Sequence, residues 1–100
     1  MNIKAVNNGD QTTLYLSGRL DTPGAESLKK ALKEAAEENP QEISLDFEEV
    51  DYVGSACVGK LIGFYKEFSA RKGKISISNL SQDVLELFRA VKLDKLFKIQ

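Results

Sequence analysis

The stretch that decides the fold is SLDFEEVDYVGSACVGKLIGFYK, residues 44–66. Polar and apolar side chains alternate along residues 43–47, which is the two-residue period of a strand with one buried and one exposed face. From Ser55 onward the apolar side chains fall on one face of a helix instead; they are Val58, Leu61, Ile62, Tyr65 and Phe68. The stretch therefore predicts a strand that leads directly into a helix, with Gly54 and Ser55 at the junction.

A hairpin and a first helix are predicted before this stretch. Asn7-Asn8-Gly9-Asp10 is a turn signal between two extended runs, residues 2–6 and 12–18. Asp21-Thr22-Pro23 then opens a helix, with Thr22 as the expected cap and the proline at the first helical position. An Asn-Pro pair ends this helix. Its buried face is expected to carry Ala25, Leu28, Ala31, Leu32, Ala35 and Ala36.

After residues 44–66, the sequence predicts another strand, a third helix and a short closing segment. Gly73 is expected to end the second helix as a C-terminal cap, and a strand follows around Ile75 and Ile77. Ser81 is the expected cap of the third helix, whose apolar side chains are Val84, Leu85, Phe88 and Val91. Residues 93–99 are expected to pack back as a turn and a strand.

Strands that alternate with helices imply right-handed crossovers and a sheet that is parallel over most of its strands. Three of the strands have a polar face, whereas a sheet covered on both sides would show continuous apolar runs. The sequence therefore predicts a single α/β domain over residues 1–100. It should have two layers, with a mixed, mostly parallel sheet of four to five strands and helices mainly on one face.

Composition narrows the classes of partner. The formal net charge is −1 and the basic residues are scattered, so neither nucleic acid nor an anionic membrane surface is an expected partner. The amino terminus has no apolar signal core, and no apolar run approaches the length of a membrane span. A single cysteine fits a reducing compartment. We therefore expect a cytoplasmic protein that does not insert into membranes.

Composition also narrows the chemistry. The chain has no histidine, so a Ser–His or Cys–His nucleophile pair and an imidazole metal site are excluded. It contains no phosphate-binding loop and no dinucleotide-binding fingerprint. We therefore expect a protein that is not an enzyme, with no catalytic residues, metal or cofactor. A nucleotide-binding protein or an enzyme built on Cys57 is the remaining alternative.

Ser55 has two interpretations at a helix start. Its hydroxyl could accept a hydrogen bond from an amide of the first turn, which stabilises a helix by about 1 kcal/mol. The same helix start, with unpaired amides and a partial positive charge, also accommodates an anion. A phosphate on Ser55 would add nearly two negative charges without unfolding the helix, and would change the surface that a partner meets.

The order of three segments resembles that of STAS domains, in particular the bacterial anti-sigma factor antagonists. In residues 44–66, Asp46 matches an aspartate at the end of an apolar strand, and Ser55 matches a phosphorylatable serine after the apolar pair Tyr52-Val53. SGRLDTPGAESL, residues 17–28, matches an upstream element through Gly18, Leu20 and Asp21, and ISNLSQDVLELFRAVKLDKLFKI, residues 77–99, is similar to the closing segments of that family.

The resemblance implies a phosphorylation-switched binding module. The unphosphorylated domain would bind a serine-kinase anti-sigma factor and so release a sigma factor, and phosphorylation of Ser55 would abolish binding. A phosphatase would reset the serine, while ATP and magnesium would belong to the kinase. Asp46 would support the loop that carries Ser55. The expected partner contacts are Asp21, Thr22, Gly54, Ser55, Ala56, Cys57 and Gly59.

Two positions depart from that family and leave alternatives open. Gly54 stands where an aspartate or serine is usual, and Cys57 stands where a glycine is usual. Both departures suit a STAS scaffold subunit of a lipid-transporting ABC complex, in which Ser55 would only cap the helix. Cys57 itself is either a small buried residue or a thiol whose pKa the helix start lowers, giving a redox-sensitive interface.

The second helix also contains two glycines in its interior, Gly59 and Gly63. Each loses about 1 kcal/mol of helix stability relative to alanine, so a compensating role is expected. One role is close packing against the rest of the chain. The other is a path along which the backbone of a partner approaches. Phe64, next to these glycines, belongs either to the edge of the core or to an interface.

Overall fold

The computed structural model describes residues 1–99, which contain five strands. The strands are β1 (Asn2–Asn8), β2 (Gln11–Leu20), β3 (Glu42–Val53), β4 (Lys74–Ser78) and β5 (Lys98–Ile99). They form one sheet in the order β1-β2-β3-β4-β5. β1 is antiparallel to β2, and the three other pairings are parallel. The helices are α1 (Thr22–Glu37), α2 (Ser55–Ala70), α3 (Gln82–Ala90) and the 3₁₀ turn η1 (Leu93–Lys95).

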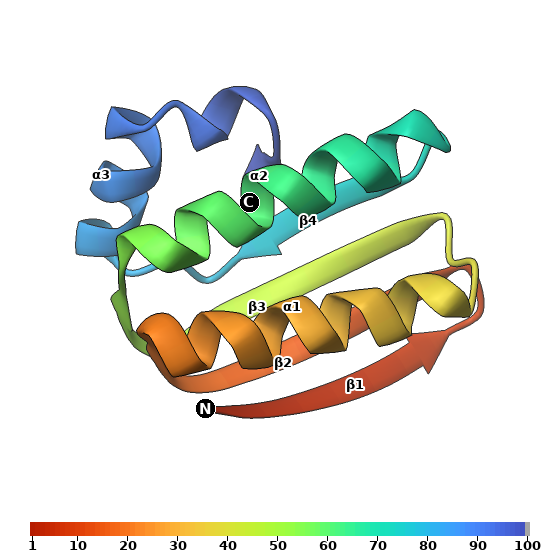
Figure 1. Cartoon of the computed structure of the whole chain (residues 1–100), viewed down its shortest axis with the longest axis horizontal. Helices are drawn as coiled ribbons and strands as arrows, with labels where there is room; N and C mark the ends of the chain where they lie inside the picture. Colours follow the sequence, from red (N-terminus) through yellow and green to blue (C-terminus); the bar gives the residue numbers. More distant parts are fainter. Residues whose placement is uncertain (100) are drawn as a thin grey trace.

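The helices form a second layer on one face of this sheet. α1 and α2 run side by side across it, and α3 lies near one end, as Figure 1 shows. On the opposite face, Tyr15 is 46% exposed and Ser17 is exposed. The prediction of a two-layer α/β fold with a mixed, mostly parallel sheet is therefore confirmed, and the sheet has five strands.

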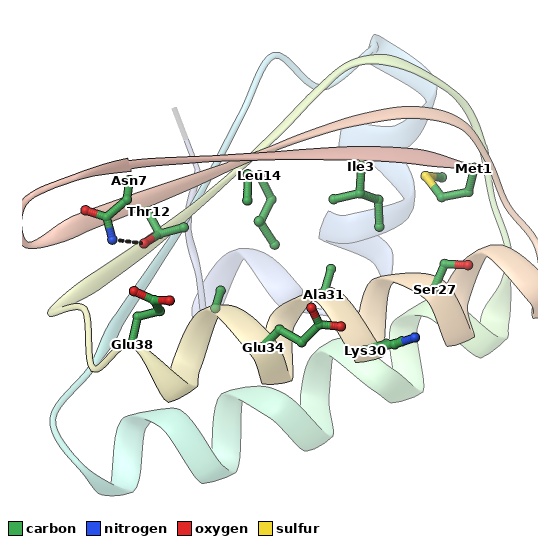
Figure 2. Close-up of a pocket in the computed structure, with 12 residues that line it drawn as sticks. Met1, Ile3, Asn7, Thr12, Leu14, Ser27, Lys30, Ala31, Glu34 and Glu38 are labelled. Atoms are coloured by element: carbon green, nitrogen blue, oxygen red, sulfur yellow. Dashed lines mark hydrogen bonds between the residues drawn. The ribbon is translucent and has the colours of Figure 1, made fainter.

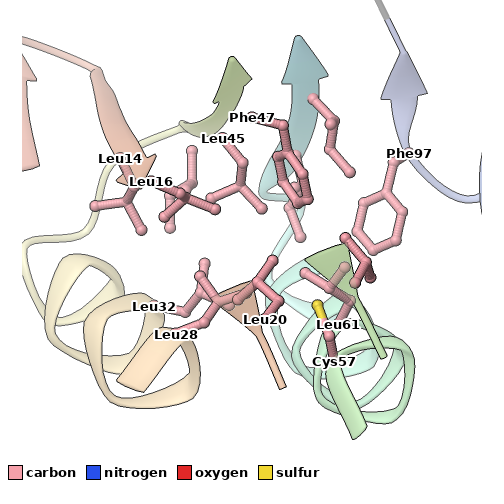
Figure 3. Close-up of a cluster of buried hydrophobic side chains, with 14 of the residues drawn as sticks. Leu14, Leu16, Leu20, Leu28, Leu32, Leu45, Phe47, Cys57, Leu61 and Phe97 are labelled. Atoms are coloured by element: carbon pink, nitrogen blue, oxygen red, sulfur yellow. The ribbon is translucent and has the colours of Figure 1, made fainter. Parts of the chain in front are cut away.

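The core lies between the sheet and the helices. Leucines of β2 and β3 face leucines of α1, and Cys57 and Leu61 of α2 extend the same cluster (Figure 3). The Phe47 ring meets the Phe88 ring edge-on at 5.7 Å between centroids, which attaches α3 to β3. This packing is one-sided because each strand alternates its side chains between the two faces.

Most predicted elements are present, with longer strands than expected. The hairpin turn is confirmed, because Asn8 pairs with Gln11 across the two-residue loop Gly9-Asp10. Ser81 caps α3 by accepting a hydrogen bond from the Val84 amide at 3.2 Å. The closing segment forms a 3₁₀ turn and a short strand, as predicted.

The predicted cap of α1 was wrong by one residue. Asp21 is the N-cap, and its Oδ1 accepts a hydrogen bond from the Gly24 amide at 2.9 Å. Thr22 is the first residue of the helix and Pro23 follows it. Both Asp and Thr cap helices well, so the residue types alone did not decide between them.

The predicted role of Gly73 at the end of α2 was also wrong. The left-handed residue that follows the helix is Lys72, with φ of 62°. Gly73 instead lies against the Phe68 ring, where a Cβ would overlap ring atoms. The glycine is needed for this close approach and not for a left-handed turn.

Candidate functional site

Ser55 is the first residue of α2 and is exposed. β3 ends at Val53, and Gly54 is the N-cap of α2, with extended backbone angles of φ −100° and ψ 175°. No side chain caps this helix, so the interpretation of Ser55 as a capping residue is wrong. Its hydroxyl faces solvent at a strand-to-helix junction.

The start of α2 differs electrostatically from the starts of the other two helices. Asp21 caps α1, and α3 has both the Ser81 cap and Asp83 in its first turn. α2 has no side-chain cap and no acidic residue in its first turn. The first amides of a helix lack intrahelical partners and carry a partial positive charge. This helix start is therefore electrostatically suited to an anion beside Ser55.

A backbone hydrogen bond joins the upstream element to the junction before Ser55. The Gly54 amide donates to the Leu20 carbonyl at 2.9 Å. Asp21 and Thr22 follow Leu20 directly, and Thr22 is exposed. The structure therefore brings together two of the predicted segments, residues 20–22 and 54–56, although about thirty residues separate them along the chain.

Arg19 and Tyr52 belong to the same surface and were not predicted there. The Arg19 guanidinium lies over the Tyr52 ring, 4.4 Å from its centroid. Arg19 Nε is also 3.9 Å from Asp21 Oδ2, in a weak, exposed ion pair. A Cβ at Gly54 would lie 3.2 Å from Tyr52 Oη, so the missing side chain at position 54 leaves room for Tyr52.

Along α2, the glycines line a groove between α1 and α2. Gly59 and Gly63 are exposed, and a Cβ at either position would have no neighbouring atom within 4 Å. Close packing within the chain is therefore not their role. The groove has a volume of about 710 Å³, and Phe64 lines it, half-buried and stacked on Phe68 at 5.3 Å between ring centroids.

Cys57 was wrongly expected to contact a partner. Its side chain is fully buried and points into the core beside Leu61 (Figure 3). Burial raises the pKa of the Cys57 thiol to about 12, the opposite of the lowering expected for a redox-sensitive interface. The interpretation of Cys57 as a small buried residue is confirmed.

Asp46 is not brought to Ser55. Its Oδ1 accepts a hydrogen bond from the Glu48 amide at 2.9 Å, and its Oδ2 accepts one from Asn79 Nδ2 at 3.0 Å. Asn79 follows β4 and has a left-handed backbone, with φ of 60°. These contacts hold the turn between β4 and α3, so any support that Asp46 gives to Ser55 is indirect.

Among residues 1–99, no group of three or more His, Cys, Asp or Glu side chains is arranged to hold a metal ion. Over the same residues, the helices are too short or too polar to cross a membrane.

Ala56 is half-buried, next to Ser55 on α2. The candidate site is a surface built from two loops and one helix start.

Sequence comparisons extend over nearly the whole chain. A family model described as "Mlab, STAS domain" matches residues 3–99. The anti-sigma-B factor antagonist of Listeria monocytogenes is 24% identical over 91 residues, which cover 91% of this chain and 80% of the relative. The anti-sigma-B factor antagonist of Bacillus subtilis is 23% identical over 99 residues, which cover 99% of this chain and 90% of the relative.

Solved structures share the fold. An anti-sigma factor antagonist from Mycobacterium paratuberculosis has a TM-score of 0.87 at 18% identity and covers 98% of this chain and 83% of its own. The Bacillus cell fate determinant SpoIIAA in its phosphorylated form has a TM-score of 0.76 at 20% identity, covering 99% and 91%. A sulfate transporter family protein from Wolinella succinogenes has a TM-score of 0.79 at 18% identity, covering 94% and 79%.

Proposed function

Because the chain belongs to the STAS domain family, we propose that it is an anti-sigma factor antagonist controlled by phosphorylation of Ser55. The unphosphorylated domain binds a serine-kinase anti-sigma factor and thereby releases a sigma factor. The kinase supplies ATP and magnesium, and a phosphatase restores the free hydroxyl. The sequence relatives named as anti-sigma-B factor antagonists support this class of partner.

The observation that carries the proposal is the exposed Ser55 hydroxyl at the uncapped start of α2. A kinase can reach this hydroxyl without unfolding the domain. The resulting dianion would lie beside the first amides of the helix, which favour negative charge. Phosphorylation therefore changes the surface charge and bulk at this point while the fold is kept.

The proposed docking surface surrounds Ser55. It combines the two loops joined by the Gly54–Leu20 hydrogen bond with Ser55 and Gly59, the exposed residues in the first turns of α2. A phosphate in the middle of this surface would repel a carboxylate of the partner and would prevent close apolar contact. The residues proposed to contact the partner are Asp21, Thr22, Gly54, Ser55, Ala56 and Gly59.

The direct test is phosphorylation by the serine-kinase anti-sigma factors encoded in the same genome. Each purified kinase is mixed with this protein, ATP and magnesium, and added phosphate is measured by intact mass. We expect one phosphate on the wild type and on Ser27→Ala, a control at an exposed serine of α1, and none on Ser55→Ala. Phosphate that persists in Ser55→Ala contradicts the proposal.

The binding arm of the test uses a phosphate mimic. Ser55→Asp is expected to melt within about 1 °C of the wild type, because position 55 is exposed and at a helix start that tolerates negative charge. Its affinity for the kinase should fall about 100-fold, through repulsion at the interface. Isothermal titration calorimetry and thermal denaturation measure the two effects separately.

A second candidate is a constitutive scaffold subunit of a lipid-transporting ABC complex. The description of the matching family model, Mlab, and the glycine at position 54 favour it. In that role Ser55 would not be phosphorylated. A stable complex with a transporter ATPase, unchanged in affinity by Ser55→Asp, would select this function over the first.

A further inference from the structure

β1 is an edge strand that is paired on one side only. It is the first strand in the sheet order, and among residues 1–99 only β2 pairs with it. An unpaired edge offers a row of N–H and C=O groups to any other strand. Proteins usually protect such an edge with prolines or several charges, whereas β1 contains one charged residue, Lys4, and no proline. This edge is therefore open to strand addition.

A groove of about 600 Å³ lies directly beneath that edge, between β1 and α1 (Figure 2). α1 packs its buried leucines against β2 and covers the inner face of β1 only in part, since Ile3 is half-buried against the core and Ala5 is exposed. The upper wall includes Ile3, which is half-buried, and Ala5, which is exposed. Ala31 and Ala35 of α1 form the lower wall. A strand added to β1 would therefore place its inward side chains over this groove, which has both apolar and polar walls.

We propose that the partner at this edge is a second copy of the same chain. The β1 strands of the two copies pair in antiparallel fashion about a two-fold axis at Ala5, and the two five-stranded sheets become one continuous sheet. This interface is independent of Ser55 and of the function proposed above.

This register pairs the whole of β1 without placing like charges opposite each other. Ala5 is the middle residue of the strand, so an axis there pairs all seven residues. Lys4 then lies opposite Val6 of the second copy, and Ile3 lies opposite its Asn7. An axis at Lys4 would instead place like charges opposite each other, which is destabilising. At the axis itself the strands meet through their smallest side chain.

The charges along α1 support the same symmetry. Lys30, Glu34 and Glu38 line the outer side of the groove, one helical turn apart. A two-fold axis reverses the direction of α1 in the second copy, so Lys30 of each chain lies opposite Glu38 of the other. The Glu34 carboxylates of the two chains lie near the axis and repel each other weakly at this separation, and Lys30 one turn away on each chain offsets part of that repulsion. The helices would be separated by about three strand spacings, roughly 14 Å, which two long side chains span.

The contact is small, because it consists of one strand pairing and one groove, so the dimer should be weak and concentration-dependent. Sedimentation equilibrium from about 1 to about 500 µM should show the mass rising from 11.1 kDa toward twice that value. Ala5→Lys places two lysines at the axis and should raise the dissociation constant at least about tenfold, with unchanged melting because Ala5 is exposed. Ala90→Lys, at an exposed alanine of α3, is the matched control.

Two further variants test the register. Ala5→Cys should be cross-linked into a covalent dimer by a short reagent that joins two thiols, since opposite Cβ atoms in a strand pair lie about 5 Å apart and the native Cys57 is buried. Glu38→Lys should weaken the dimer, and Glu38→Lys combined with Lys30→Glu should restore it. A chain that stays monomeric at every concentration overturns the proposal and leaves the edge to an extended segment of another protein. A dimer unaffected by Ala5→Lys, or one that Ala5→Cys does not cross-link, overturns it as well.

Discussion

At the scale of single residues, Ser55 and Cys57 are separated by one residue on α2 and have opposite environments. Ser55 is exposed at the helix start, whereas Cys57 is fully buried. Successive helix positions rotate by about 100°, so a shift of two residues turns a side chain from the surface into the core. Whether a side chain at the start of α2 is accessible to a reagent or an enzyme therefore depends on the face of the helix that carries it, and not on its distance from the helix start.

The Cys57 thiol should be unreactive in the folded protein. At pH 8 we expect Ellman's reagent to modify it only after addition of guanidinium, because the buried side chain is inaccessible and its pKa is raised to about 12. Ser55→Cys, at the exposed position, is the matched positive control and should react with one equivalent at once. Fast modification of the wild type without denaturant would contradict the buried placement.

The same burial predicts a pH dependence of stability. Below pH 9 the thiol is protonated in both states, so its contribution is complete. Between pH 9 and about 12 the unfolded chain releases a proton that the folded chain retains, so the free energy of unfolding falls, by up to about 1.4 kcal/mol per pH unit. Urea denaturation of the wild type and of Cys57→Ala should give curves that converge across this range, since the variant lacks the thiol.

At the scale of elements, α2 combines a buried face with an exposed glycine face. Gly59 and Gly63 have no neighbouring atoms where a Cβ would lie, so the fold does not require them. An exposed glycine inside a helix costs about 1 kcal/mol relative to alanine. α2 is therefore less stable than it would be with alanine at positions 59 and 63, and these positions lie along the proposed docking surface.

Gly59→Ala and Gly63→Ala should separate stability from binding. Each is expected to raise the free energy of unfolding by about 0.5–1 kcal/mol, measured by urea denaturation, because alanine favours the helix. Gly59→Ala should weaken partner binding about tenfold if a partner backbone approaches there. Lys66→Ala, on an exposed position of the same helix, is the control for both measurements. A destabilised Gly59→Ala would show that the glycine packs within the chain after all.

The cap of α1 offers a second test at this scale. Asp21→Ala removes the hydrogen bond to the Gly24 amide and should cost about 1 kcal/mol of stability in thermal or urea denaturation. Asp21→Asn keeps a cap oxygen and should retain most of that stability. Thr22→Ala, the cap expected from sequence, should change stability by less than about 0.5 kcal/mol.

The sequence predicted the positions of the strands and helices better than it predicted which side chains of α2 are buried. Alternation and helical spacing located the strands and helices because burial imposes those periods. The apolar face of α2 was predicted in part: Leu61 and Phe68 are buried as expected, Cys57 is buried as well, and Val58, Ile62 and Tyr65 are half-buried against the core. The glycines removed side chains from the opposite face, so the apolar stripe had no clear boundary.

Only part of the candidate site could be predicted from the sequence, because some of its contacts join residues that are distant along the chain. Ser55, Asp21 and Gly54 could be placed because a motif of fixed order contains them. The stacking of Arg19 on Tyr52 joins two strands that are distant in sequence, and no local pattern encodes it. Lys72, and not a glycine, adopts the left-handed conformation after α2, while Gly73 lies against Phe68.

At the scale of the whole molecule, the two faces of the sheet should differ in their tolerance of substitution. Phe88→Ala removes a fully buried ring that packs on Phe47 and should cost about 3–5 kcal/mol, a large part of the stability of a domain of this size. Tyr15→Ala, on the open face, should cost less than about 1.5 kcal/mol. Equal losses in urea denaturation would mean that the open face is covered.

The parallel pairing of β2 with β3 also governs how quickly the chain assembles. β1 and β2 join through a two-residue loop, so that hairpin closes locally, on a timescale of about 1–10 µs. Every partner of β2 in β3 lies beyond the whole of α1, and the remaining parallel pairings likewise span a helix. Loop-closure entropy must therefore be overcome three times before the sheet is complete, and rapid formation of the intervening helices shortens each search. The speed of folding, more than the final stability, is what lengthening a helix–strand connection would change.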